Sequence, residues 1–414
     1  MEHKIISGGL AATFSLMAST AFAQDMKAEV MHWWTSGSEA AALRVLADAY
    51  EAKGGKWVDD AVPGATAAVA AATSAIVTGN APAALQFNGG KLFPELAAQG
   101  LLTDLTPYAD AGDWEEALPA GIVDAISYDG KIYAMPVANH GVNWMWFSKA
   151  ALESAGTEVP ETFDGFFPML DKLKNAGIQP IAQSGEGWVI FETFYQLMLI
   201  SGHLDLYKAM FQEGDVDAIE SDEFREFVDI FRKYASYADQ GTAGRKWNDA
   251  TAMVVSGDAG VQLMGDWAKG EFKSAGQKPG VDFECRIGFG DDTYFLTAFD
   301  VFVLPKSNSE SMEVVHEKLA DTFMDPEVQV AFNLIKGGLP PRLDVQTEAF
   351  DSCAQRGFEA MAEPAHQVPG VEISTPADRA GGYTDAVLQL WANPDMSTDD
   401  FVDSIKGVIR STGY

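Results

Sequence analysis

Positive charge is scarce in this sequence. Its 414 residues include 28 Lys and Arg against 60 Asp and Glu, which gives a formal net charge of −32 at pH 7. Nucleic-acid binding needs clustered basic side chains that displace counterions, and anionic membrane surfaces repel an acidic protein. The composition therefore excludes nucleic acid as a partner and indicates a well-solvated, acidic surface.

Catalytic motifs are missing as well. The chain has six His, and it contains no G-x-S-x-G elbow, no H-E-x-x-H zinc motif and no Walker loop. Nothing localises a carboxylate pair of the kind that glycoside hydrolysis needs. We therefore expect a protein that is not an enzyme and that has no metal and no cofactor. A secreted carbohydrate-active enzyme is the alternative.

Long apolar runs are absent except near the start. Residues 5–18 are apolar and follow Lys4, and Ala21-Phe22-Ala23 has the small-x-small pattern that signal peptidase cuts. The run is shorter than the roughly 20 residues that a membrane-spanning helix needs. We predict that residues 1–23 are a signal peptide cleaved after Ala23, and that the chain is exported.

Cysteine is nearly absent, with only Cys285 and Cys353. Paired cysteines in an exported protein commonly form a disulfide, because the compartment is oxidising. We predict a Cys285–Cys353 bond, with two buried free thiols as the alternative. A lone pair with so few His is a poor zinc site.

The mature chain alternates short apolar runs with helical patterns. Strands are expected at residues 28–34, 56–62 and 83–87, with helices at 38–53 and 65–78 between them. Ser36 and Glu39 form an S-x-x-E capping box at the start of the first helix. This order predicts an α/β fold with a mostly parallel sheet, whose ligands lie beyond the carboxyl ends of the strands. The length fits two to three domains.

Further strands are expected at residues 131–136, 143–147, 260–264 and 296–304. Helices are expected at 191–206, 221–237 and 312–335. Seven segments along this order resemble the family 1 extracellular solute-binding proteins of ABC importers, and most of all the periplasmic glucose and galactose binders. They are residues 33–37, 86–89, 130–136, 139–147, 264–267, 299–306 and 338–342.

The resemblance implies a two-lobe periplasmic binding protein of type II, with a ligand cleft between lobes joined by three hinge crossings. It places residues 25–137 and 297–340 in the N-terminal lobe, and 138–296 and 341–414 in the C-terminal lobe. The crossings are expected near 136–140, 293–299 and 339–342. It also implies a periplasmic monomer that captures a small sugar and delivers it to ABC permease subunits at the inner membrane.

Aromatic rings stack on the C–H faces of a sugar, while charged and amide groups bind its hydroxyls. For Trp33 and Trp34, which adjoin at a strand end, we expect one to stack on the ligand and the other to wall the cleft, because successive strand residues face opposite sides. Core packing is the alternative. Trp267, after a later strand, is expected to stack on the opposite face.

Asp300 interrupts an apolar strand, and a buried lone carboxylate is costly unless it is paired. We expect it to bind ligand hydroxyls, with a structural salt bridge as the alternative. Glu39 stands where the resembled sugar binders place a hydroxyl acceptor, in competition with its capping role. The other candidate ligand contacts, chosen from strand ends and proposed crossings, are Gln86, Asn88, Lys91, His140, Asn143, Asp266, Lys336 and Arg342.

One departure from the resembled glucose binders concerns their histidine in the C-terminal segment facing the cleft. Residues 374–379 contain no histidine here, and Arg379 is a candidate substitute. A monosaccharide other than glucose, an alditol, or a sugar acid paired with Arg379 therefore stays open. Binders of amino acids, peptides or polyamines form a third class, which needs fixed charges opposite an amine or carboxylate.

Overall fold

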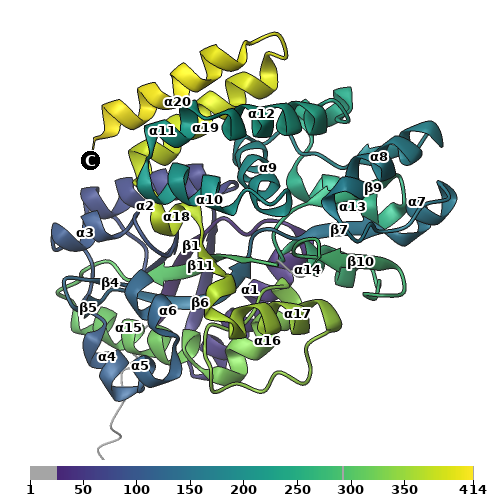
Figure 1. Cartoon of the computed structure of the whole chain (residues 1–414). Coiled ribbons are helices and arrows are strands. Elements are labelled where there is room, and N and C mark those ends of the chain that lie inside the picture. The colour runs from purple at the N-terminus through teal and green to yellow at the C-terminus, as the bar shows by residue number, and fades with distance from the viewer. Residues whose placement is uncertain (1–25, 291–292, 414) are drawn as a thin grey trace, which may run out of the picture.

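The computed structural model describes residues 26–290 and 293–413 (Figure 1). The predicted signal peptide and its cleavage site lie outside these residues. Two large sheets organise the described chain, one of six strands and one of four. We refer to the units built on them as the N-terminal and C-terminal lobes.

The first sheet begins as the sequence predicts. β1 (Lys27–His32), β2 (Lys56–Ala61) and β3 (Ala84–Asn88) are parallel, with α1 (Gly37–Ala52) and α2 (Ala65–Thr78) as crossovers. Beyond β3 the sheet is mixed, because β11 (Phe295–Val303) runs antiparallel to β3 and to β6 (Ala134–Gly141) but parallel to β12 (Gln367–Pro369). The carboxyl ends of β1 and β3 therefore point toward the second lobe, as a ligand-binding edge requires.

The rest of the N-terminal lobe is helical apart from one small hairpin. Pro326 separates the two helices that replace the single predicted one over 312–335. The elements are α3 (Pro94–Ala98), α4 (Thr106–Ala111), α5 (Trp114–Ala117), α6 (Ala120–Ala125), β4 (Ser127–Tyr128), β5 (Lys131–Ile132), α15 (Glu310–Phe323) and α16 (Pro326–Lys336).

The second sheet has the order β10-β7-β9-β8 and is surrounded by helices. Its strands are β7 (Met145–Ser148), β8 (Gln179–Ile181), β9 (Ala259–Leu263) and β10 (Phe283–Arg286). Its helices are α7 (Lys149–Ser154), α8 (Phe166–Asn175), α9 (Gly187–Ile200), α10 (Leu204–Tyr207), α11 (Val216–Glu220), α12 (Asp222–Ala235), α13 (Trp247–Ser256) and α14 (Ala268–Ser274).

The C-terminal part of the chain packs mainly on this second unit, although its strand β12 joins the six-stranded sheet. It forms α17 (Ser352–Ala362), β12 (Gln367–Pro369), α18 (Val371–Ser374), α19 (Ala377–Ala392) and α20 (Thr398–Thr412). Figure 1 shows α12, α19 and α20 together at the top, far from α4, α5 and α15 at the lower left. The last helices therefore cap the C-terminal lobe.

Buried apolar residues form separate clusters for the two units. One cluster draws on residues 28–138 and 299–332. A second draws on 142–263 together with 296 and 368–409. A third, smaller cluster packs Trp144 and Trp146 with α17. Separate cores allow the two units to move as bodies.

The proposed crossing segments lie side by side. Phe299 pairs with Asn139 in the β6–β11 ladder, and Asn139 in turn forms an isolated bridge with Leu339. β12 adds a fourth segment here, since it pairs with residues 295–297 of β11. The chain therefore passes between the units through one narrow bundle of extended segments.

Two glycines lead into the last of these crossings. Gly337 has a φ of +103°, which a residue with a Cβ rarely adopts. A Cβ there would lie 2.5 Å from the carbonyl oxygen of Asp266, and one on Gly338 would lie 2.8 Å from the His140 ring. The backbone thus approaches the neighbouring elements too closely for any side chain.

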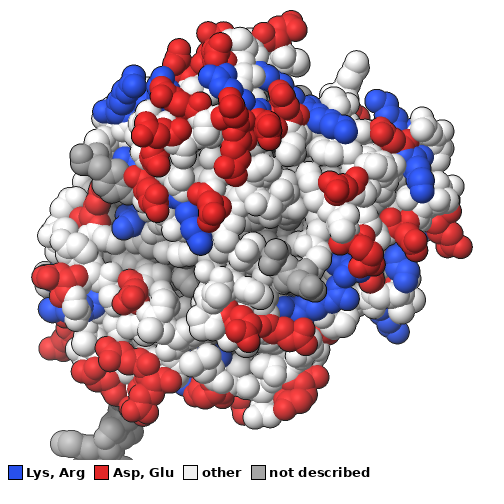
Figure 2. All heavy atoms as spheres, viewed as in Figure 1, with Lys and Arg blue, Asp and Glu red and all other residues white. Residues whose placement is uncertain are grey.

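Cys285 and Cys353 form a disulfide that joins β10 to α17, so the predicted pairing is confirmed. Figure 2 shows acidic side chains spread over the visible face, with Lys and Arg scattered among them. No helix within residues 26–290 and 293–413 combines the length and apolarity that crossing a bilayer requires.

Candidate functional site

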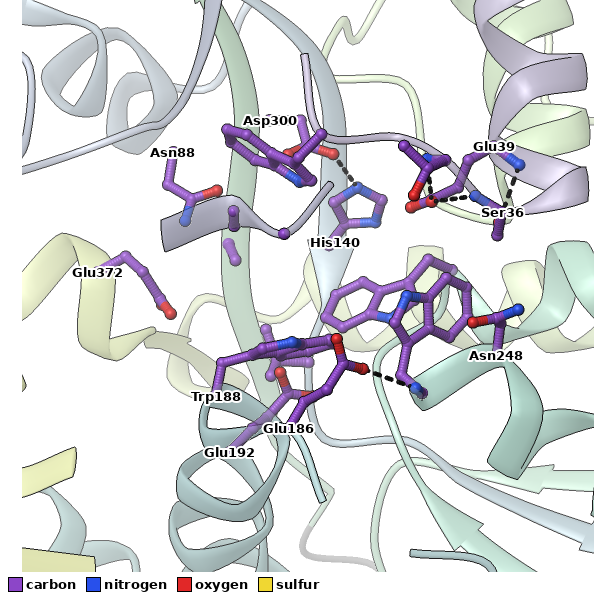
Figure 3. Close-up of a pocket in the computed structure, with 18 of the residues that line it drawn as sticks. Ser36, Glu39, Asn88, His140, Glu186, Trp188, Glu192, Asn248, Asp300 and Glu372 are labelled. Atoms are coloured by element: carbon purple, nitrogen blue, oxygen red, sulfur yellow. Dashed lines mark hydrogen bonds and ion pairs between the residues drawn. The ribbon is translucent and has the colours of Figure 1, made fainter. Parts of the chain in front are cut away.

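A cavity of about 310 Å³ lies between the two lobes (Figure 3). Its N-terminal wall comes from the ends of β1 and β3, the middle of β11 and the start of α1. Its C-terminal wall comes from α9, α13, α18 and the segment after β9. This volume lies within the range of small-molecule sites.

Indole rings line both walls. Trp33 belongs to the N-terminal wall, and Trp188, Trp247 and Trp267 to the C-terminal wall. Trp267 stands edge-on to His140, with ring centroids 5.3 Å apart, and its ring centroid lies 6.2 Å from that of Trp188. The cavity therefore offers flat apolar faces from two sides.

Glu39 caps α1 and also lines the cavity. Its Oε2 accepts hydrogen bonds from the backbone N–H groups of Thr35 and Ser36, each at 3.1 Å, as the capping box predicts. Its Oε1 lies 3.0 Å from Nζ of Lys336, the last residue of α16. Both residues line the cavity and are buried, so the pair is a fixed donor and acceptor set.

His140 bridges two carboxylates beneath the cavity. Its Nδ1 lies 2.5 Å from Oδ1 of Asp266, and its Nε2 lies 2.9 Å from Oδ2 of Asp300. Burial by itself would lower the pKa of His140, but the two carboxylates outweigh it and raise that pKa to about 9. The ring is therefore an imidazolium that donates both N–H groups at neutral pH.

Asp300 thus has a structural partner as well as a place on the cavity wall. Burial would raise its pKa, but hydrogen bonding and the charge of His140, with Lys336 and Gln86, bring the pKa below its ordinary value. Gln86 Nε2 donates to Oδ1 at 3.0 Å, and Oδ2 accepts a hydrogen bond from Nε2 of His140. The carboxylate is ionised and held in one orientation.

The structure places four sequence candidates behind the cavity lining instead of in it. Trp34 is buried in the N-terminal core, with its ring centroid 5.2 Å from that of Phe332, so core packing holds for this tryptophan. Gln86 supports Asp300, as described above, and also accepts from the Trp33 N–H. Asp266 holds His140 and accepts from the Gly141 N–H at 2.8 Å.

Asn143 is the fourth of these. Its amide donates to the carbonyls of Ile287 and Tyr294, and its oxygen accepts from the Leu296 N–H. It ties β11 to the segment before β7, where a ligand has no access.

The basic candidates Lys91, Arg342 and Arg379 also lie outside the cavity lining. Lys91 is exposed. Arg342 forms an ion pair with Asp344, with its Nη2 2.7 Å from Oδ2. Arg379 is fully buried within the C-terminal lobe, where its Nε donates to Thr412 of α20. The expectation that Arg379 replaces a cleft histidine is therefore wrong, because this helix face packs inward.

The residue that the C-terminal segment does present to the cavity is Glu372, in α18. Sequence reasoning missed it, together with Trp188, Trp247 and Glu192. A signal existed for Glu192, since it is the lone charged residue in the apolar helix α9 (GWVIFETFYQLMLI), just as Asp300 is in its strand. Trp247 is the first residue of α13, where no pattern assigns a direction to its side chain.

Glu192 and Glu372 make the C-terminal wall acidic. Burial raises the pKa of Glu192 well above its ordinary value, and the charge of Glu372 adds to the rise. Burial also raises the pKa of Glu372. Within residues 26–290 and 293–413, no group of three or more His, Cys, Asp and Glu has an arrangement that suits a metal ion.

Residues 34–308 match the bacterial extracellular solute-binding protein family. The chain belongs to this family. It is similar to a protein of Brucella suis named a probable sugar-binding periplasmic protein, with 40% identity over 365 residues that cover 87% of this chain and 86% of the relative. The family and this relative are binding proteins by name, not enzymes.

Solved structures share the fold. A bacterial solute receptor described as having an exclusive preference for β-D-galactopyranose aligns with a TM-score of 0.80 at 18% identity, over 93% of this chain and 98% of its own. Maltose-bound MalE3 of T. maritima aligns with a TM-score of 0.78 at 17% identity, over 93% and 99%. The fold is the two-lobe α/β fold of periplasmic solute-binding proteins, as expected.

Proposed function

We propose that this protein is the periplasmic sugar-binding component of an ABC importer, and that its ligand is a monosaccharide bound between the lobes. The observation that carries the proposal is the cavity itself. Indole faces on both walls stand beside fixed charged groups, which is the combination that a pyranose needs for its C–H faces and its hydroxyls. The names of the Brucella relative and of the galactose receptor support it.

The proposed ligand contacts are the sequence candidates that line the cavity. Trp33 and Trp267 would stack on opposite faces of the ring. Hydroxyls would be bound by Glu39, Asn88, His140, Asp300 and Lys336. Among the alternatives, an alditol lacks the rigid faces that indoles favour. A sugar acid would meet the carboxylates of the C-terminal wall, with Arg379 out of reach.

We also propose the lobe division given above, with residues 25–137 and 297–340 in one lobe and the remainder in the other. The separate apolar clusters support it, as does the meeting of the three crossing segments at Asn139. Ligand would close the lobes by a hinge motion about that bundle. We propose further that the protein is a monomer, that it delivers its ligand to inner-membrane permease subunits, and that cleavage after Ala23 releases it into the periplasm.

A thermal-shift screen of residues 24–414 tests the proposal. The panel contains monosaccharides, disaccharides, alditols, sugar acids and amino acids, because a ligand that binds only the folded state raises the midpoint by mass action. A rise with a monosaccharide is expected, and Trp267→Ala should weaken that ligand at least about tenfold. A rise with amino acids alone would contradict the proposed sugar site.

A further inference from the structure

The two walls of the cavity differ in charge balance. On the N-terminal wall each charged group faces a partner of opposite sign. Glu39 is 3.0 Å from Lys336, and Asp300 is 2.9 Å from the His140 imidazolium. A neutral ligand with hydroxyl groups satisfies such a wall, since each pair is already compensated and offers both donors and acceptors.

The C-terminal wall has no such balance. Glu192 is buried and accepts hydrogen bonds from Gln196 Nε2 at 2.7 Å and from the backbone N–H of Gly265. The Oε2 atom of Glu372 is fully buried and has no hydrogen-bond partner. Neither carboxylate forms an ion pair with any Lys, Arg or His among residues 26–290 and 293–413. Figure 3 shows Glu372 at the left of the cavity and Glu192 below it, on separate helices.

Buried acids without a cation are unfavourable in their charged form. Burial raises the pKa of both groups, and the two charges repel each other. Tyr195, which also lines this wall, has its pKa raised by burial and then by both carboxylates. The two carboxylates and Tyr195 therefore influence one another electrostatically. Lys246, the basic residue on the same wall, is exposed to solvent.

The aromatic groups of this wall also favour a positive charge on the ligand. Trp188 and Trp267 line the same wall with their ring centroids 6.2 Å apart, and Nζ of Lys336 lies 5.9 Å from the centroid of the Trp267 ring. Indole faces attract cations by their quadrupole, and the attraction grows in a desolvated site. The buried carboxylates without a cation, supported by the indole face of Trp188, thus favour a positive group on the ligand.

We propose that the ligand is an amino sugar whose protonated amine binds between Glu192 and Glu372, while its hydroxyls bind the balanced N-terminal wall. This rests on the proposed function, because the sugar ring is what the N-terminal wall and Trp33 recognise. An amine forms charge-assisted hydrogen bonds to both carboxylates and keeps them ionised. The amine thus supplies the positive charge that the described part of the chain does not place beside these two carboxylates.

Isothermal titration at about pH 6, where such an amine is protonated, tests the proposal on the mature protein. The probes are glucosamine and galactosamine, each with its parent hexose and its N-acetyl derivative, which keeps the nitrogen but adds an acetyl group and removes the charge. One amino sugar is expected to bind at least about tenfold more tightly than its parent hexose and its N-acetyl form.

The variant Glu372→Gln is expected to remove most of that difference, with a much smaller effect on the parent hexose. Glu192→Gln is the second variant, in case the first fails to fold. Glu359→Gln is the matched control, because it is the same substitution at an exposed site outside the cavity. Equal losses for amino sugar and hexose in Glu372→Gln would make Glu372 a hydroxyl acceptor and overturn the inference.

The titrations distinguish a failure of this inference from a failure of the proposed function. Tighter binding of a parent hexose than of its amino sugar overturns this inference and upholds the proposed function. Binding of putrescine without binding of any sugar overturns both.

Discussion

Lys336 Nζ lies 3.0 Å from Oε1 of Glu39, while the other oxygen of that carboxylate caps the first turn of α1. The contact joins the end of α16 to the start of α1, two helices that are remote in sequence and pack together. Because both side chains are buried, neither has water as a substitute partner.

The variant Lys336→Met is expected to lower the free energy of unfolding by about 3 kcal/mol, because it leaves the Glu39 carboxylate buried and unpaired. Denaturant unfolding measures this loss. In the double variant Glu39→Gln/Lys336→Met much of the loss should disappear, which gives a coupling energy by a double-mutant cycle. Strictly additive losses would mean that the pair is not coupled.

The adjacent tryptophans are expected to respond in opposite ways. Trp33→Ala should weaken ligand binding at least about tenfold with little change in stability, because this ring lines the cavity. Trp34→Phe should cost about 1–3 kcal/mol of stability and leave affinity unchanged, because Trp34 is packed in the core. Thermal unfolding and titration of the same samples check both. A loss of affinity in Trp34→Phe at full stability would contradict the assignment.

The His140 ion pairs predict a dependence of stability on pH. The pKa of His140 is raised to about 9, above its ordinary value of 6.5. The charged His140 therefore contributes about 3 kcal/mol to the free energy of unfolding. This contribution is fully present below pH 6.5 and is lost as pH rises through 9. The stability difference between wild type and His140→Gln should shrink between pH 7 and 10, as measured by urea unfolding. A constant difference over that range would show that the imidazolium adds nothing to the stability of the protein.

The disulfide closes a loop with a sequence separation of 68 residues. The loop-entropy relation predicts a loss of about 4 kcal/mol when it is removed. The double variant Cys285→Ser/Cys353→Ser should show this loss in denaturant unfolding, and wild type in reducing agent should match it. If reduction left the midpoint unchanged, the bond would not contribute to stability.

Much of the N-terminal lobe could be predicted from local pattern. The predicted helix over 65–78 coincides with α2, and Ser36 and Glu39 form the capping box that their spacing indicates. The antiparallel pairing of β11 with β3 and β6 was not predicted, because it joins segments more than 150 residues apart. A strand's partners depend on the whole chain, whereas its existence depends on a few neighbouring residues.

The cavity residues likewise divide into those that local sequence pattern predicts and those that it does not. Trp33, His140 and Asp300 line the cavity as expected, since each lies at a strand end or breaks an apolar strand. Glu372 and Trp247 were missed, because they lie in a short helix and at a helix start, where tertiary packing sets the direction of the side chain. Arg379 looked available for a ligand, but α20 covers it.

Gly337 and Gly338 leave no space between the last crossing and the groups beneath the cavity. A methyl group on residue 338 would push against the same imidazole that orients Asp300. The loss of ligand affinity that a substitution causes is therefore not set by the distance of the substituted residue from the sugar. A mutational scan of this chain should find positions that never touch the solute and yet change its affinity, and this glycine pair should be among the least tolerant of them.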